Sequence, residues 1–444
     1  MSEQSSLLSA LAPPGGKSDR LHCEERSDEA IQNPRKRTGL LRFVRNDGGA
    51  GPASTRLLGV IGLALALGYL IVLAGACLNG QFLLDAQGRP LANDFVNVFA
   101  AGELARAGNA AAAYDWTLHK AAEIRAVGHD FANYYGWHYP PIFLFVATAL
   151  AMLPYLVAAI AWLATTLAAF AATFAAVLGS RAGLFLALGC PATLWNIAAG
   201  QNGFFTAALI GGTLGLLEKH PALAGICLGL LTYKPQFGIL LPIVLIADRR
   251  WLTVIVAAVV ALALAAASWL AFGTASWEAF VHWLPVVSHA TLGEGLAGWT
   301  RLQSLYALVR IHGGSDTLAA LVQATLALTL AVGLVCLWRS RVPYEIKASA
   351  LAAGTLLATP YVYIYDEVVL AVPVAFLLRL ALARGLLLSD AVGLAGACAL
   401  LLAYPYIKLQ VGLVAALIVL ATTAARLFAN SHHAKTLHGQ MPRN

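Results

Sequence analysis

The sequence predicts an all-α polytopic membrane protein. Hydrophobic residues make up 59% of the 444 residues, charged residues make up only 11%, and the mean hydropathy is +0.72. A soluble domain carries more charge, because a polar surface encloses its core. The apolar runs are rich in Leu and Ala, have the length of membrane-spanning helices, and lack the alternation of barrel strands.

The excess of positive charge is interpreted as a membrane signal. The formal net charge is +7, which in a soluble protein would suggest a nucleic-acid partner. In a membrane protein, Lys and Arg retain loops in the cytoplasm and contact anionic headgroups. We therefore expect membrane lipids as partners and no nucleic acid.

The cysteines do not indicate a metal site or a disulfide framework. They are scattered along the chain and form no CxxC pair, so we expect neither feature. We also expect no cofactor. The six positions are Cys23, Cys77, Cys190, Cys227, Cys336 and Cys398.

The first 55 residues differ in composition from the rest of the chain. Residues 17–49 are dense in charge and lack the apolar core and cleavage site of a signal peptide. Their stretches HCEERSDEAIQ and GLLRFVRNDGG resemble a translated bacterial intergenic repeat. We predict a cytoplasmic segment over 1–55, disordered or derived from such a repeat. A transmembrane domain over 56–430 and a cytoplasmic tail over 431–444 follow.

The positive-inside rule orders the membrane passes. Residues 57–78 form the first span, and 79–141 form a long first outer loop. Basic clusters expected in the cytoplasm lie at 180–183, 218–220, 248–251, 339–347 and 384. Turns expected outside lie at 200–203, 233–236, 274–315, 359–366 and 404–408. The pattern predicts about twelve passes, with both termini in the cytoplasm and 274–315 as a second outer loop.

Two stretches do not fit regular spans. Residues 142–178 must cross the membrane once, so we predict a surface or re-entrant helix over 142–153, ending at Pro154, and a span over 155–178. Segments 221–232 and 237–247 are too short to cross about 30 Å of hydrocarbon at about 1.5 Å per residue. They suit broken helices beside a water-filled cavity.

Uncommon polar residues recur at the outer turns. Polar side chains at the edge of a membrane domain are costly and by default indicate a functional site. They occur as Asp94 in NDFVNVF and within WHYPP, GQNG, YKPQ and TPYVYIYDE. The candidate substrate-binding residues are His138, Tyr139, Gln201, Asn202, Lys234, Gln236, Tyr361 and Asp366.

Each motif also has a structural explanation. The prolines of WHYPP suit a helix start, and its aromatic residues could form an interfacial belt. GQNG could be a tight turn between helices. Lys234 could extend its charge toward the headgroups, although a neutral residue would serve a plain turn. Asp94 could cap a helix over 95–106.

Together the motifs suit transfer of a group from a lipid-phosphate donor. A cation such as Lys234 would hold the phosphate as charge builds on the leaving group. A carboxylate would take the proton from an attacking sugar hydroxyl. We predict that this base is Asp94, carried on a segment that Phe95 and Val98 anchor along the membrane surface. Its competitors are Asp85, Glu103, Asp115 and the more distant Asp366.

The order of these motifs resembles that of the membrane glycosyltransferases of family 87, a GT-C group, over about residues 57–425. The resemblance implies a polyprenyl-phosphate sugar donor, typically carrying mannose, and a lipid or glycan acceptor. It further implies inversion without a metal at the outer, periplasmic face of the bacterial inner membrane, with Asp94 as the base. The best-studied relatives have a late outer motif richer in histidine. This chain has Tyr361, Tyr363, Tyr365 and Asp366 there, which leaves the sugar and the acceptor open.

A transporter or lipid flippase is the alternative class. It would also use broken helices and buried polar residues, but it commonly shows an internal repeat. The loop over 79–141 has no equal-sized partner in the second half, and the polar motifs do not recur in corresponding places. The sequence therefore favours the enzyme.

Overall fold

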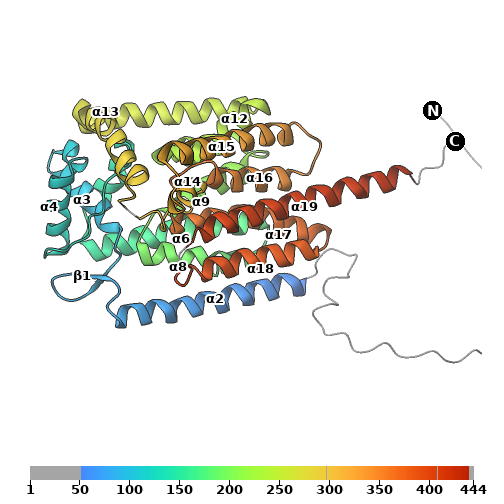
Figure 1. Cartoon of the computed structure of the whole chain (residues 1–444), viewed down its shortest axis with the longest axis horizontal. Helices are drawn as coiled ribbons and strands as arrows, with labels where there is room; N and C mark the ends of the chain where they lie inside the picture. Colours follow the sequence, from blue (N-terminus) through green and yellow to red (C-terminus); the bar gives the residue numbers. More distant parts are fainter. Residues whose placement is uncertain (1–51, 297, 408, 440–444) are drawn as a thin grey trace, which may run out of the picture. The chain divides into compact units, whose positions relative to one another are not determined.

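The computed structural model describes residues 52–296, 298–407 and 409–439, and these residues are mostly helical (Figure 1). Their only sheet is a two-stranded hairpin, in which β1 (Leu83–Leu84) pairs antiparallel with β2 (Pro90–Leu91). The all-α prediction is confirmed. Most of the predicted 1–55 segment lies outside the described residues, as do the last five residues of the predicted tail.

The described residues contain five helices that are long and apolar enough to cross a membrane. A bent pair, with 55° between its halves, would make a sixth span. The five are α2 (Pro52–Leu78), α6 (Tyr155–Leu178), α13 (Trp251–Ser288), α15 (Asp316–Trp338) and α19 (Val411–Gly439). The bent pair is α7 (Ala182–Leu188) and α8 (Pro191–Ala199). The chain is therefore a multi-pass helical membrane protein, and the count of twelve stays a prediction.

Shorter helices fill the space between these spans. Several of them are apolar but too short for a regular crossing. The shorter helices are α9 (Gly203–Leu216), α10 (Pro221–Leu230), η3 (Leu231–Tyr233), α11 (Pro235–Gly238), α12 (Leu240–Ala247), α16 (Tyr344–Leu357), η5 (Ile364–Leu370), α17 (Ala371–Arg384) and α18 (Leu388–Leu402). The predicted breaks within 221–247 are present, because the chain changes helix at Lys234 and again at Ile239.

The helix break before the second long span also agrees with the sequence. Two short helices, η2 (Pro141–Phe143) and α5 (Leu144–Leu150), precede Pro154, which is the N-cap of α6. Proline fixes its own φ and has no N–H to donate, so it suits this first position. Gly179 ends α6 in the left-handed conformation, with φ 73°. The membrane position of α5 stays a prediction.

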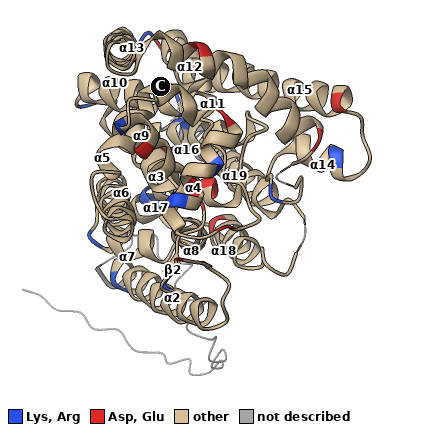
Figure 2. Ribbon diagram, turned by 90° about the vertical axis from the view of Figure 1, so that its left-hand side faces the viewer, with Lys and Arg blue, Asp and Glu red and all other residues tan. Residues whose placement is uncertain are grey.

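One end of the helical assembly carries the predicted outer segments (Figure 1). The hairpin, α3 (Phe95–Arg106), η1 (Ala110–Ala113) and α4 (Trp116–Val127) gather there, beside the second half of α13. In the view onto this end, α6 carries no Lys, Arg, Asp or Glu (Figure 2). Such a helix can face lipid without burying a charge.

The predicted second outer loop contains more helix than a plain loop would. After a kink at Gly273, where φ is 77°, α13 continues to Ser288. The π-helix η4 (His289–Gly293) and α14 (Leu305–Ile311) follow. The kink divides α13 into an apolar first part and a second part that reaches α4, where Trp283 stacks on Trp116.

Helix α3 lies inside the protein rather than along a surface. Phe95 is fully buried, Val98 is 3% exposed, and Phe95 packs edge-on against Tyr155 of α6. The predicted anchoring of Phe95 and Val98 at a membrane surface is therefore wrong. Protein packing fixes the segment instead, because both faces of the helix are apolar enough to be enclosed by α4, α5 and α6.

Candidate active site

A cavity of about 800 Å³ opens at the end of the molecule that carries α3 and α4. Its walls come from segments far apart in the chain, namely the start of α3, Trp116 at the start of α4, residues 132–139, the turn at 199–201, the end of α13 with the loop after it, residues 363–365 and Tyr404. Asp94, His138, Tyr139 and Gln201 line it. The structure thus brings together one predicted base and three predicted binding residues.

Asp94 presents its carboxylate to this cavity. Its backbone N–H donates to the Ala199 carbonyl at 2.8 Å, which fixes the start of α3 against the end of α8. The side chain makes no capping hydrogen bond to α3 and accepts one from Gln201 Nε2 at 3.2 Å. The capping explanation therefore does not hold. The Asp94 carboxylate is therefore open to the cavity.

Burial raises the pKa of the Asp94 carboxyl to about 6. The Gln201 hydrogen bond and the positive charge of Arg301 both lower the pKa and partly oppose the rise. A carboxylate in this range is ionised at neutral pH and holds a proton more readily than an ordinary Asp does. These are the properties that a general base needs.

The GQNG turn holds the amide that contacts Asp94. Gly200 ends α8 with φ 73°, and Gln201 and Asn202 follow as buried residues. The Tyr139 hydroxyl donates to Gln201 Oε1 at 3.2 Å, and Asn202 Nδ2 donates to the same hydroxyl at 2.7 Å. Asn202 does not line the cavity itself, but its hydrogen bond holds the Tyr139 side chain that does. GQNG is both a turn and part of the site.

The WHYPP motif contributes one exposed and two buried aromatic rings. Trp137 is buried and stacks on Phe143, with ring centroids 5.7 Å apart. Tyr139 is buried, and its carbonyl accepts a hydrogen bond from Tyr114 at 2.9 Å. His138 is exposed into the cavity. The alternation of buried and exposed residues, followed by the two prolines at the start of η2, places His138 at the cavity.

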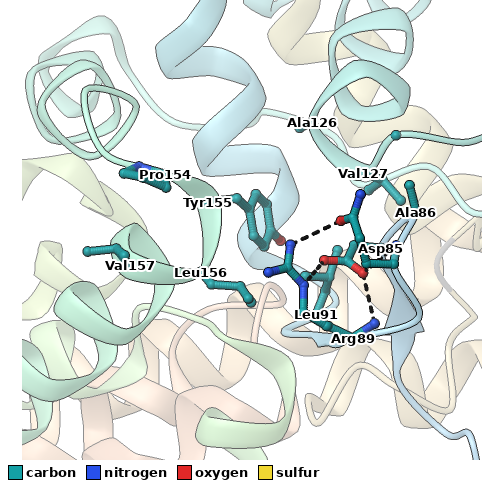
Figure 3. Close-up of a pocket in the computed structure, with 12 residues that line it drawn as sticks. Asp85, Ala86, Arg89, Leu91, Ala126, Val127, Pro154, Tyr155, Leu156 and Val157 are labelled. Carbon is teal, nitrogen blue, oxygen red and sulfur yellow. Dashed lines mark hydrogen bonds and ion pairs between the residues drawn. The ribbon is translucent and has the colours of Figure 1, made fainter.

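The acidic residues near Asp94 that were also candidates for the base either have structural roles or lie outside the cavity. Asp85 accepts hydrogen bonds from the backbone N–H groups of Gln87 and Arg89 and pairs with the Arg89 guanidinium, so it closes the hairpin (Figure 3). Asp115 caps α4 by accepting from Thr117 and Leu118. Glu103 lies more than two turns beyond Asp94 in α3 and does not line the cavity.

Asp85 and Arg89 also border a smaller cavity of about 470 Å³ (Figure 3). This second cavity lies between the hairpin, the end of α4 and the first turn of α6. Its apolar wall includes Leu91 and Val127, which belong to a small hydrophobic cluster that Tyr135 also contacts. Because Tyr135 lines the main cavity, this cluster supports the main cavity from outside.

A model of glycosyltransferase family 87 matches residues 137–360, just over half of the chain. The chain belongs to glycosyltransferase family 87. It is therefore a membrane glycosyltransferase, and the transporter alternative loses its support. No curated protein and no solved structure matches the chain.

The range matched to family 87 covers only part of the predicted site. His138, Gln201 and Lys234 lie within it, whereas Asp94 and Asp366 lie outside. The match thus confirms the suspected family but leaves the base untested. Among the residues that the structure describes, no group of three or more His, Cys, Asp or Glu is arranged to hold a metal ion.

Lys234 does not lie where a phosphate-binding residue was expected. Its ammonium donates to Asp366 Oδ1 at 2.7 Å, and both side chains are almost fully buried. Asp366 also accepts from the Tyr363 N–H at 3.1 Å. Neither Lys234 nor Asp366 lines the cavity. The pair joins the turn before α11 to η5, across 132 residues of sequence.

Two other predicted residues lie away from the cavity lining. The Tyr361 hydroxyl donates to Ser288 Oγ at 2.7 Å and connects the 359–366 segment to the end of α13. Gln236 is half-buried in α11. Both therefore lie beside the elements that form the site, and neither contacts the cavity.

Arg301 is a charged residue of the cavity that the sequence motifs did not indicate. It is exposed, lines the cavity, and lowers the pKa of Asp94. Gln303 holds its loop, since the Gln303 N–H donates to the Val362 carbonyl at 2.6 Å and its amide donates to the Arg301 carbonyl at 3.4 Å. The available signal was an arginine in a predicted outer loop, where the positive-inside rule disfavours it.

Proposed function

We propose that this family 87 enzyme transfers a hexose, with mannose as the first candidate, from a polyprenyl-phosphate donor. The acceptor would be a lipid or a glycan, and the active site would face the periplasm at the inner membrane. One observation carries the proposal. Asp94 is a carboxylate open to the cavity, with an amide as its hydrogen-bond donor and a pKa of about 6.

In the proposed reaction, an acceptor hydroxyl oxygen attacks the anomeric carbon of the donor sugar. The bond between that carbon and the phosphate oxygen breaks, and polyprenyl phosphate leaves with the bonding electron pair. Asp94 takes the hydroxyl proton as the new glycosidic bond forms. Because the nucleophile attacks from the face opposite the phosphate, the anomeric configuration inverts.

Arg301 is the proposed partner of the donor phosphate, in place of Lys234. A guanidinium can donate two parallel hydrogen bonds to phosphate oxygens and stays charged at any physiological pH. Arg301 lines the cavity, whereas the Lys234 ammonium already pairs with Asp366. With Arg301 neutralising the charge that develops on the leaving group, the mechanism needs no metal.

The position of the cavity supports a lipid-borne donor. Val287 in the last turn of α13 and Ala290 in η4 line it, and Tyr139 precedes the apolar helices η2 and α5. A donor whose chain stays among the lipids can thus bring its phosphate to a site at the end of the spans. A water-soluble donor would not require this arrangement.

The test is an assay of the purified full chain in nanodiscs with a panel of radiolabelled polyprenyl-phosphate sugars. We expect consumption of one member, the mannose compound first, with formation of an inverted product or free sugar. The Asp94→Asn variant serves as the inactive control. Folded wild-type protein that consumes no member of the panel would overturn the donor assignment.

A further inference from the structure

We infer that the part of the cavity lined by Asn97, Trp116 and Tyr134 binds an uncharged sugar of the acceptor. This inference rests on the proposed function and narrows it. It assigns the acceptor hydroxyl to a neutral glycan rather than to an anionic lipid headgroup. Three independent features of these residues support it, namely unpaired polar atoms, aromatic surface and the distribution of charge.

Two buried polar atoms beside the cavity lack hydrogen-bond partners. Asn97 is 4% exposed, and no described residue pairs with its Oδ1. It lies three residues after Asp94 in α3, so the two side chains project from the same face of the helix. The Tyr134 hydroxyl is also buried and unpaired among the described residues. Buried polar atoms are costly to leave unpaired, and sugar hydroxyls would satisfy both.

Trp116 supplies an aromatic surface next to these polar atoms. Its ring stacks on Trp283, with centroids 5.5 Å apart, and lies 5.9 Å from the Tyr134 ring. Asp115 caps the helix at the preceding residue and so fixes the start of α4. The C–H face of a pyranose packs on such a ring, while its hydroxyls reach neighbouring polar groups.

The charges in the cavity suffice for one phosphate only. Asp94 and Arg301 are the only Asp, Glu, Lys or Arg among the described residues that line it. Lys120, the nearest cation on α4, is occupied by the Asn133 carbonyl and the Phe131 ring. A second anion would therefore meet the negative charge of Asp94 without a cation of its own. Like charges in a partly buried site repel strongly.

The experiment measures binding to the purified full chain in nanodiscs by equilibrium dialysis. The probes are tritiated butyl glucopyranoside, galactopyranoside and mannopyranoside, each compared with its 6-phosphate. We expect at least one neutral glycoside to bind, and its 6-phosphate to bind at least about tenfold more weakly. Tighter binding of the phosphorylated probes would overturn the inference.

Variants then locate the binding. Trp116→Ala and Asn97→Ala should each weaken binding of the neutral glycoside by about tenfold, whereas Trp116→Phe should keep most of it. Trp251→Ala removes the same side chain from an exposed position on α13 and serves as the matched control. Wild-type affinity in both alanine variants would overturn the inference.

A parallel measurement separates this inference from the proposed function. Donor consumption is followed in wild-type protein with the polyprenyl-phosphate sugars. If no donor is consumed while glycoside binding depends on Trp116 and Asn97, the donor assignment fails and the sugar site stands. If donor is consumed but binding does not depend on these residues, the acceptor site fails and the proposed function stands.

Discussion

Asp94 and Asp366 are both carboxylates enclosed by the helical assembly, yet their surroundings differ. Asp94 lines the cavity and accepts one hydrogen bond, from the Gln201 amide. Asp366 is 1% exposed and pairs with the Lys234 ammonium and the Tyr363 N–H. A carboxylate that must accept a proton cannot be saturated by a permanent cation. The comparison therefore supports the proposal that Asp94 is the base, and it favours a structural role for Asp366.

The largest expected effect comes from Asp94→Asn. The amide keeps the size of the side chain but cannot take a proton, so transfer should fall by about a hundredfold or more. Thermal unfolding of the purified protein should stay near that of wild type, because Asp94 makes no cap. Near-normal transfer by this variant would move the base to another residue and remove the contrast with Asp366.

The next effect concerns stability rather than chemistry. Lys234→Ala leaves the Asp366 carboxylate buried without a cation, which should cost about 3–5 kcal/mol of the free energy of unfolding. The double variant Lys234→Met/Asp366→Leu should recover most of this loss, because it removes both charges. Thermal and denaturant unfolding in detergent measure the difference. A stable Lys234→Ala protein that loses donor affinity would instead restore Lys234 as the phosphate-binding residue.

A smaller effect is expected at Arg301. Arg301→Ala should raise the KM for the polyprenyl-phosphate donor by about tenfold to a hundredfold, the value of a charge-assisted hydrogen bond. Arg301→Lys should retain part of the affinity, since the charge survives without the planar geometry. Arg341→Ala, at an exposed arginine of the predicted cytoplasmic turn 339–347 and outside the cavity, is the matched control. An unchanged donor KM in Arg301→Ala would leave the phosphate without an assigned partner.

The smallest effect is a shift in pH dependence. If Asp94 is the base, it must be ionised to act, and kcat/KM should fall about tenfold per pH unit below a pKa of about 6. The positive charge of Arg301 lowers this pKa, so Arg301→Gln should move the acidic limb to higher pH. Initial rates from pH 4.5 to 8 test this. A limb that does not move in Arg301→Gln would show that the two groups do not interact.

Much of the fold followed from local sequence patterns. Hydropathy predicts α2 and α6, and the proline at 154 predicts the break before α6, because these signals act within a few residues. Gly273 was harder to interpret, since one glycine in an apolar run does not reveal whether helix resumes. The helical stretch of α13 after the kink was therefore expected as loop.

The sequence predicts those site residues that stand out within their own local motif. Asp94, Tyr139 and Gln201 were recognised as uncommon residues, and all three meet at the cavity. The pairing of Lys234 with Asp366 joins positions 132 residues apart, and no local pattern encodes such a contact. Arg301 could not be predicted, because it belongs to no local motif that distinguishes it from other charged residues of its loop. Single charges acquire a role only when their neighbours in space are known.

The GQNG turn has a consequence for how this protein tolerates change. A Cβ on Gly200 would lie 2.5 Å from the Ala92 Cβ, and one on Gly203 would lie 2.3 Å from the Tyr365 carbonyl oxygen. The two glycines are therefore contact points at which three distant chain segments touch. The motif therefore requires residues without a side chain at two positions, in addition to the polar Gln201 and Asn202. In a library of variants, both positions should accept glycine alone, because any larger residue would push apart the walls that carry Asp94 and Tyr365.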